Sequence, residues 1–121
     1  MATTLKHDYI GGHSVELLRS GEQFFAANIR LINQAKNYIH FQTYIVDEDE
    51  TGMRIIDALA RAAERGVRTY LLLDAFGTKY LSGELIKKIE NSGILFRFFS
   101  PAFIKKGFQL SLRLHHKVLL V

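Results

Sequence analysis

The chain has 121 residues, of which 48% are hydrophobic and 23% are charged, as is usual for one globular domain or part of one. It contains no cysteine, which excludes disulfide bonds and thiolate metal sites, and no apolar run reaches the roughly 18 residues of a membrane span. The net charge of +4 at pH 7 suits an anionic or phosphate-bearing partner, although charge alone identifies none.

Strand-like and helix-like stretches alternate along the chain. Residues 1–13 are polar and are predicted to be a flexible N-terminal segment, followed by one domain over residues 14–121. Runs rich in β-branched and aromatic residues predict strands over 14–19, 38–46, 67–74 and 94–99, and a last strand in the apolar run that ends at Val121. Apolar residues at helical spacing predict helices over 22–36, 52–65 and 81–91, the first capped by Ser20. This alternation predicts an α/β fold with a mostly parallel sheet and helices on both faces.

Two histidines and a lysine directly precede the last apolar run. Residues i and i+2 of a strand share a face, so His115 and Lys117 are predicted to point together and His116 to point away. An imidazole beside an ammonium group suits a phosphate centre, because the ammonium binds the phosphate oxygens and the imidazole can act as a nucleophile or proton carrier. The residues alone leave open a solvated strand start without chemistry. A metal site is disfavoured because the side chains of adjacent strand residues diverge.

Acidic residues occur at two other places that bear on a site. Asp74 ends the strand predicted over 67–74, and ligands of open α/β sheets lie at the carboxyl ends of the strands. It is a candidate for binding substrate or orienting an imidazole, and a simple turn before Gly77 is the alternative. The four consecutive acids of Asp47–Glu50 indicate a solvated lead-in to a helix rather than a cation site.

Basic and apolar side chains interleave between residues 99 and 114. Lys105, Lys106 and Arg113 alternate there with phenylalanine, leucine and isoleucine. This pattern suits an interface with anionic lipid headgroups or with nucleic acid, and these three residues are candidates for substrate binding. A connection that packs on the domain and leaves its lysines in water is the alternative.

Read in order, these pieces resemble the N-terminal half of a member of the phospholipase D superfamily, and of bacterial cardiolipin synthases in particular. The signature of that superfamily is H-x-K-x4-D, and residues 115–121 supply H-x-K-x4. Five further segments resemble these synthases in order and spacing: SGEQFF at 20–25, YIVDEDETG at 44–52, the predicted helix before RGV at 65–67, LLLDAFGT at 71–78 and FRFFSP at 96–101. Because the chain stops one residue before the motif aspartate, in an apolar run without turn residues, a fragment of a longer protein is expected.

The resemblance implies one half of a phospholipase D-like α/β/α sandwich, truncated at its C-terminal end. In this family two halves with one H-x-K each share a site, so His115 would be the nucleophile that forms a phosphohistidine and Lys117 a phosphate ligand. No metal or other cofactor is implied. The parent enzyme would be a phosphatidyltransferase that makes cardiolipin from phosphatidylglycerol, bound peripherally at the cytoplasmic face of the bacterial membrane.

Three expectations about the chain itself follow from the resemblance. The chain alone should be inactive, should need the missing C-terminal half, and should self-associate through an exposed sheet edge and apolar face. The alternatives are a phosphodiesterase or nuclease that uses water as acceptor, or a non-catalytic lipid-binding module. Nucleic acid is the less favoured partner, because the apolar and basic connection over 99–114 suits lipid better.

Overall fold

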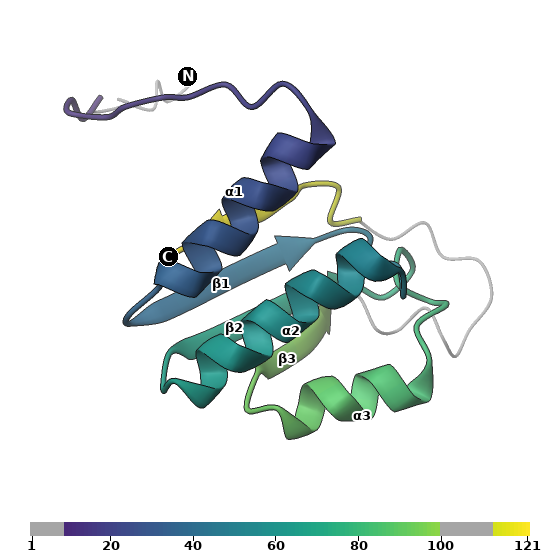
Figure 1. Ribbon diagram of the computed structural model, residues 1–121. Helices are drawn as coiled ribbons and strands as arrows, with labels where there is room; N and C mark the ends of the chain where they lie inside the picture. The colour runs from purple at the N-terminus through teal and green to yellow at the C-terminus, as the bar shows by residue number, and fades with distance from the viewer. Residues whose placement is uncertain (1–8, 100–112) are drawn as a thin grey trace, which may run out of the picture.

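Three helices and four strands alternate along the chain in the computed structural model, which describes residues 9–99 and 113–121 (Figure 1). In chain order the elements are α1 (Gly21–Gln34), β1 (Tyr38–Thr43), α2 (Glu50–Glu64), β2 (Arg68–Asp74), α3 (Gly83–Asn91), β3 (Leu95–Phe99) and β4 (Val118–Leu120). None of the described helices combines the length and the apolar character needed to cross a bilayer.

The four strands form one mixed sheet in the order β3-β2-β1-β4. β1, β2 and β3 are parallel neighbours, whereas β4 runs antiparallel to β1, with Gln42 opposite Val118. The predicted α/β class and mostly parallel sheet are therefore confirmed.

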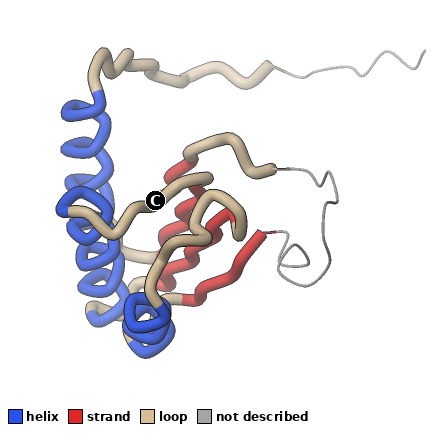
Figure 2. The backbone as a smooth tube through the Cα atoms, turned by 90° about the vertical axis from the view of Figure 1, so that its right-hand side faces the viewer, coloured by secondary structure: helices blue, strands red, loops and turns tan. Residues whose placement is uncertain are grey.

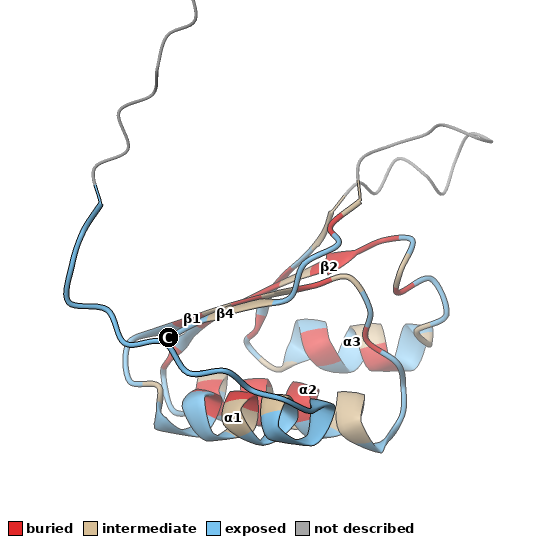
Figure 3. Ribbon diagram, turned by 90° about the horizontal axis from the view of Figure 1, so that it is seen from above, coloured by how far each residue is buried: buried red, intermediate tan, exposed pale blue. Residues whose placement is uncertain are grey.

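All three helices lie against one face of this sheet (Figure 3). The sequence predicts helices on both faces, and the described residues do not show that arrangement. The reason is the strand order, because the chain moves from β1 through β2 to β3 in one direction across the sheet. Right-handed crossovers that advance in one direction place their helices on the same face, and α1 joins that layer by packing against α2.

The strand predicted over residues 14–19 is absent. Residues 9–19 form neither helix nor strand, their side chains are exposed, and they run away from the helices and the sheet (Figure 2). Val15 and Leu17 show the required alternation but have exposed fractions of 93% and 78%. A strand needs a neighbouring strand to satisfy its backbone groups, and this segment pairs with none in the described part of the chain.

Each helix begins at a side chain that caps it. The Ser20 hydroxyl accepts the backbone N–H of Gln23, as predicted, and the hydroxyl of Ser82 accepts that of Leu85. Asp49 caps α2 by accepting the N–H of Gly52 at 2.8 Å. The acidic stretch 47–50 therefore acts as a helix lead-in, and no cluster of three or more potential metal-ligating His, Asp or Glu side chains occurs in the residues described.

The core lies between the sheet and the helix layer. Alternate residues of β1 and β2 point into it, namely Ile39 and Phe41 from β1 and Leu71 and Leu73 from β2. Of the helices, α2 contributes the most buried side chains, among them Ile56 and Leu59. The other face of the sheet, here called the open face, carries the intervening residues, among them His40, Gln42 and Tyr70. The rings of His40 and Tyr70 stack there with centroids 4.5 Å apart.

We expect Leu59→Ala to lower the free energy of unfolding by about 2–5 kcal/mol, because it opens a cavity at a fully buried position between α2 and the sheet. Urea denaturation followed by circular dichroism measures the loss. Leu95→Ala is the matched control, since Leu95 is 55% exposed and should cost less than about 1 kcal/mol. Equal losses at the two positions would contradict this placement of the core.

Candidate functional site at the carboxyl edge of the sheet

The His115–Lys117 segment lies at the carboxyl edge of the parallel strands because β4 is antiparallel. Gln42, next to the last residue of β1, pairs with Val118, the first residue of β4. Residues just before Val118 therefore lie beyond the carboxyl end of β1. This is the edge at which open α/β sheets bind their ligands.

The three polar residues of this segment are exposed and make different contacts. The ring of His115 meets the ring of Tyr44 edge to face, with centroids 4.6 Å apart and planes at 81°. Nε2 of His116 lies 3.1 Å from Oε1 of Gln42, a residue of the open face. His115 thus has an aromatic neighbour from the chain just beyond β1.

Lys117 lies on the helix side of the sheet. With Phe41, Thr43 and Ile55 it lines a cavity of about 290 Å³ between β1 and the starts of α1 and α2. His116 and Lys117 therefore reach opposite faces, as the alternation of a strand requires. His115, two residues before Lys117, instead contacts Tyr44, which follows the carboxyl end of β1. The H-x-K segment therefore crosses the carboxyl end of β1 and does not lie on a single face of the sheet.

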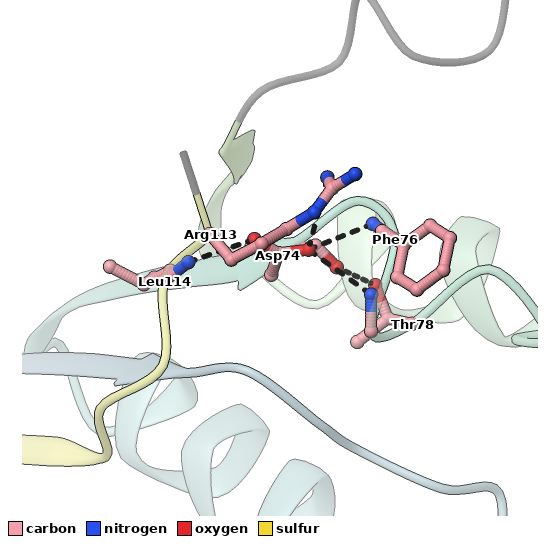
Figure 4. Close-up of polar contacts among 6 residues, drawn as sticks. Asp74, Phe76, Thr78, Arg113 and Leu114 are labelled. Atoms are coloured by element: carbon pink, nitrogen blue, oxygen red, sulfur yellow. Dashed lines mark hydrogen bonds and ion pairs between the residues drawn. The ribbon is translucent and has the colours of Figure 1, made fainter. Parts of the chain in front are cut away.

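Asp74 is fully buried at the end of β2, and both oxygens of its carboxylate are occupied. One oxygen accepts the backbone N–H groups of Phe76 and Gly77 at 2.9 and 3.1 Å, and the other accepts that of Leu114 at 3.0 Å (Figure 4). The hydroxyl of Thr78 in turn donates to the carbonyl of Asp74. This carboxylate therefore ties the turn after β2 to the residue directly before His115.

Arg113 adds a positive charge beside this carboxylate. Its Nη1 atom lies 4.0 Å from Oδ1 of Asp74, and its guanidinium group lies over the ring of Phe76, 4.6 Å from the centroid. Burial by itself raises the pKa of Asp74. The N–H groups of Leu114, Gly77 and Phe76, together with Arg113, outweigh burial and lower that pKa below its ordinary value of 3.8.

The structure brings some of the predicted site residues together and separates others. Asp74, Arg113 and the backbone before His115 form one cluster, whereas Lys117 lines the cavity on the helix side. Asp74 is linked to His115 through the main chain, since its carboxylate holds backbone groups and Arg113. The candidates Lys105 and Lys106 lie outside the described residues.

Tyr44 contacts His115 but is absent from the candidates predicted from the sequence. The signal for it was present in the alternation of residues 38–46, which puts Tyr44 in one row with His40 and Gln42 at the carboxyl end of a strand. What that pattern could not give was the return of residue 115 to this place, because the two residues are 71 positions apart in the chain.

Comparison with known proteins finds similarity over most of the chain. Residues 28–121 match the family model described as "Cardiolipin synthase, PLD-like domain". The chain is 34% identical over 112 residues to Cardiolipin synthase B of Salmonella typhimurium, which covers 91% of this chain and 27% of that protein. Over 119 residues it is 32% identical to Cardiolipin synthase B of Escherichia coli strain K12, covering 97% of this chain and 29% of that protein.

A cardiolipin synthase of Oceanobacillus iheyensis is 30% identical over 120 residues, covering 97% of this chain and 25% of that protein. Among solved structures, the polyphosphate kinase of Porphyromonas gingivalis is similar with a TM-score of 0.46 and 21% identity, over 64% of this chain and 13% of that one. This last similarity is too slight to support a conclusion.

The chain has the α/β fold with an H-x-K segment that defines a phospholipase D-like domain. It belongs to the cardiolipin synthase family of these domains, as the sequence resemblance indicates, and it spans 25% to 29% of the length of the three relatives compared.

We expect the stability contributed by Asp74 to be lost in acid. Because its folded-state pKa lies below the unfolded value of 3.8, this contribution is complete above that value and declines as the pH falls through the folded-state pKa. Asp74→Asn should cost about 1–3 kcal/mol at pH 7, since the amide N–H₂ would face the N–H of Leu114, and should flatten the decline below about pH 4.

Urea denaturation between pH 2 and pH 7 measures this difference. Asp57→Asn is the matched control, because Asp57 forms an exposed ion pair with Lys88, with 2.9 Å between the charged atoms. The control should change stability by less than about 1 kcal/mol and keep the slope of the unmodified chain. An unchanged acid decline in Asp74→Asn would show that Asp74 is not the group responsible.

Proposed function

We propose that this chain supplies one half of the active site of a phosphatidyltransferase that makes cardiolipin from phosphatidylglycerol through a phosphohistidine. The observation that carries the proposal is the position of the H-x-K segment, exposed at the carboxyl edge of the sheet in a domain of the cardiolipin synthase family. The relatives that support it are named cardiolipin synthases.

In the proposed reaction an imidazole nitrogen of His115 attacks the phosphorus of one phosphatidylglycerol. The new N–P bond replaces the P–O bond to the headgroup, and glycerol leaves after taking up a proton. A hydroxyl group of a second phosphatidylglycerol then attacks the phosphohistidine, loses its proton and releases the imidazole. Two molecules of phosphatidylglycerol thereby give one cardiolipin and one glycerol, with no change in oxidation state.

In this proposal, Lys117 supplies the positive charge near the phosphate. The ammonium group of Lys117 binds the non-bridging oxygens, where negative charge builds up in the transition state. Lys105 and Lys106 remain predicted contacts for the anionic headgroups. Arg113 acts from a greater distance, since its guanidinium lies against Asp74 and Phe76.

The proposed site needs a second H-x-K. One histidine attacks while another protonates the leaving alcohol, and this sequence contains a single H-x-K, at 115–117. The chain by itself is therefore proposed to be inactive and to work with the C-terminal half of a longer protein at the cytoplasmic face of the membrane. The open face, with Leu95 and Leu120 more than half exposed, is a surface through which the separate chain would self-associate.

A chimera tests the assignment. The chain replaces the matching residues of Cardiolipin synthase B from Escherichia coli, and the products formed in phosphatidylglycerol vesicles are identified by mass spectrometry. We expect His115→Ala to lower kcat by about a thousandfold or more, because it removes the nucleophile, and Lys117→Ala by about a hundredfold. His116→Ala, the neighbouring control, should stay within about threefold.

The products separate the alternatives. Phosphatidic acid in place of cardiolipin would show that water is the acceptor and that the site is hydrolytic. Cardiolipin formation that survives His115→Ala would exclude His115 as the nucleophile. Turnover by the 121-residue chain alone would contradict the proposed half-site.

A further inference from the structure

Tyr44 holds the ring of His115 at a defined angle. It lies one residue beyond β1, and its ring meets the imidazole edge to face, with 4.6 Å between centroids and 81° between planes. In this arrangement the positive edge of one ring faces the negative face of the other, so the contact is attractive and directional. An exposed histidine without such a neighbour would sample several rotamers.

Tyr44 is in turn held by the turn after β2. A Cβ atom placed on Gly77 would collide with the carbonyl oxygen of Tyr44 and would lie 3.1 Å from its Cδ2 atom. Contacts of this kind leave no room for a side chain at position 77. The backbone of the turn therefore packs directly on the backbone and the ring of Tyr44, and this close packing requires glycine.

The same turn also holds the main chain directly before His115. Asp74, three residues before Gly77, accepts the N–H of Gly77 with one oxygen and that of Leu114 with the other. Leu114 is only 7% exposed, so the residue preceding His115 is fixed by packing as well as by this hydrogen bond. One turn thus fixes both the backbone and the ring neighbour of His115.

We propose that Tyr44 and the turn Asp74–Thr78 position the imidazole of His115 for reaction, Tyr44 through its ring and Asp74 through the backbone of Leu114. Both are positioning residues, since neither is placed in contact with a substrate. The consequence for the reaction rests on the proposed role of His115 as nucleophile, whereas the geometry can be measured in the chain without catalysis. Holding a reacting group in one orientation removes rotational freedom that the transition state would otherwise lose.

Nuclear magnetic resonance of the 121-residue chain tests the geometry. We expect nuclear Overhauser effects between the ring protons of Tyr44 and His115, and three-bond couplings at His115 that report one χ1 rotamer. Tyr44→Phe keeps the ring and should keep both signatures. Tyr44→Leu should bring the His115 couplings to rotamer-averaged values. Asp74→Asn removes neither aromatic side chain but weakens the attachment of Leu114. It should therefore reduce the nuclear Overhauser effect between the Tyr44 and His115 rings by at least half.

Tyr70→Leu is the matched control, because it removes a tyrosine from a second tyrosine–histidine pair, with His40 on the open face. It should alter the signals of His40 and leave those of His115 unchanged. Tyr44 is only partly buried, so replacing it should leave the core intact. The Tyr44 variants therefore test the proposal even if Asp74→Asn does not fold. Averaged His115 couplings in the unmodified chain, or couplings unchanged by Tyr44→Leu, would overturn the proposal.

The chimera gives the kinetic counterpart. Tyr44→Leu should lower kcat about tenfold with little change in KM, and Tyr44→Phe should restore it, because positioning affects the reaction step more than binding. An unchanged kcat in Tyr44→Leu would overturn the positioning role. A chimera that forms no cardiolipin while the His115 signatures are present in the chain would contradict the proposed function and leave the positioning geometry established.

Discussion

The arrangement of the candidate site depends on the hydrogen bonds that the buried carboxylate of Asp74 accepts. An ionised carboxylate removed from water is strongly destabilising unless hydrogen bonds and opposite charge replace its hydration. Three backbone N–H groups and Arg113 do so here, and one of these groups belongs to Leu114, 40 positions further along the chain. The desolvated charge thereby converts a local turn after β2 into a long-range link that fixes where the H-x-K segment begins.

Strand direction is the second constraint. The carboxyl ends of β1, β2 and β3 lie at one edge of the sheet, and a segment that precedes a fourth parallel strand would lie at the opposite edge. Because β4 is antiparallel, His115 arrives instead beside Tyr44 and the turn after β2. A motif at the start of a strand can therefore occupy the edge that parallel sheets normally reserve for residues at strand ends.

Much of the fold could be predicted from the sequence because its signals are local. Helical spacing, the Ser20 cap and β-branched runs are each contained within a few residues, and the structure confirms three helices and the strands that follow them. The prediction of a strand at 14–19 was wrong, because a strand requires a neighbouring strand and the local sequence pattern does not show whether one is present. The one-sided helix layer follows from strand order, which is likewise a property of the whole sheet. At the candidate site, His115 and Lys117 could be proposed as candidates from the sequence. The hydrogen bond from Leu114 to Asp74 and the packing of Gly77 on Tyr44 depend on contacts between distant segments.

β4 lies at the edge of the described sheet, next to β1. Its three residues pair with β1, and Leu119 is its contribution to the packed interior, whereas β1 and β2 lie at the centre of the sheet beneath the helix layer. The segment that carries His115 and Lys117 is held on both sides, by the hydrogen bond from Leu114 to Asp74 and by the pairing of Val118 with Gln42. Between these two attachments three consecutive polar residues are exposed, so their side chains are presented to solvent from a backbone that is fixed before and after them.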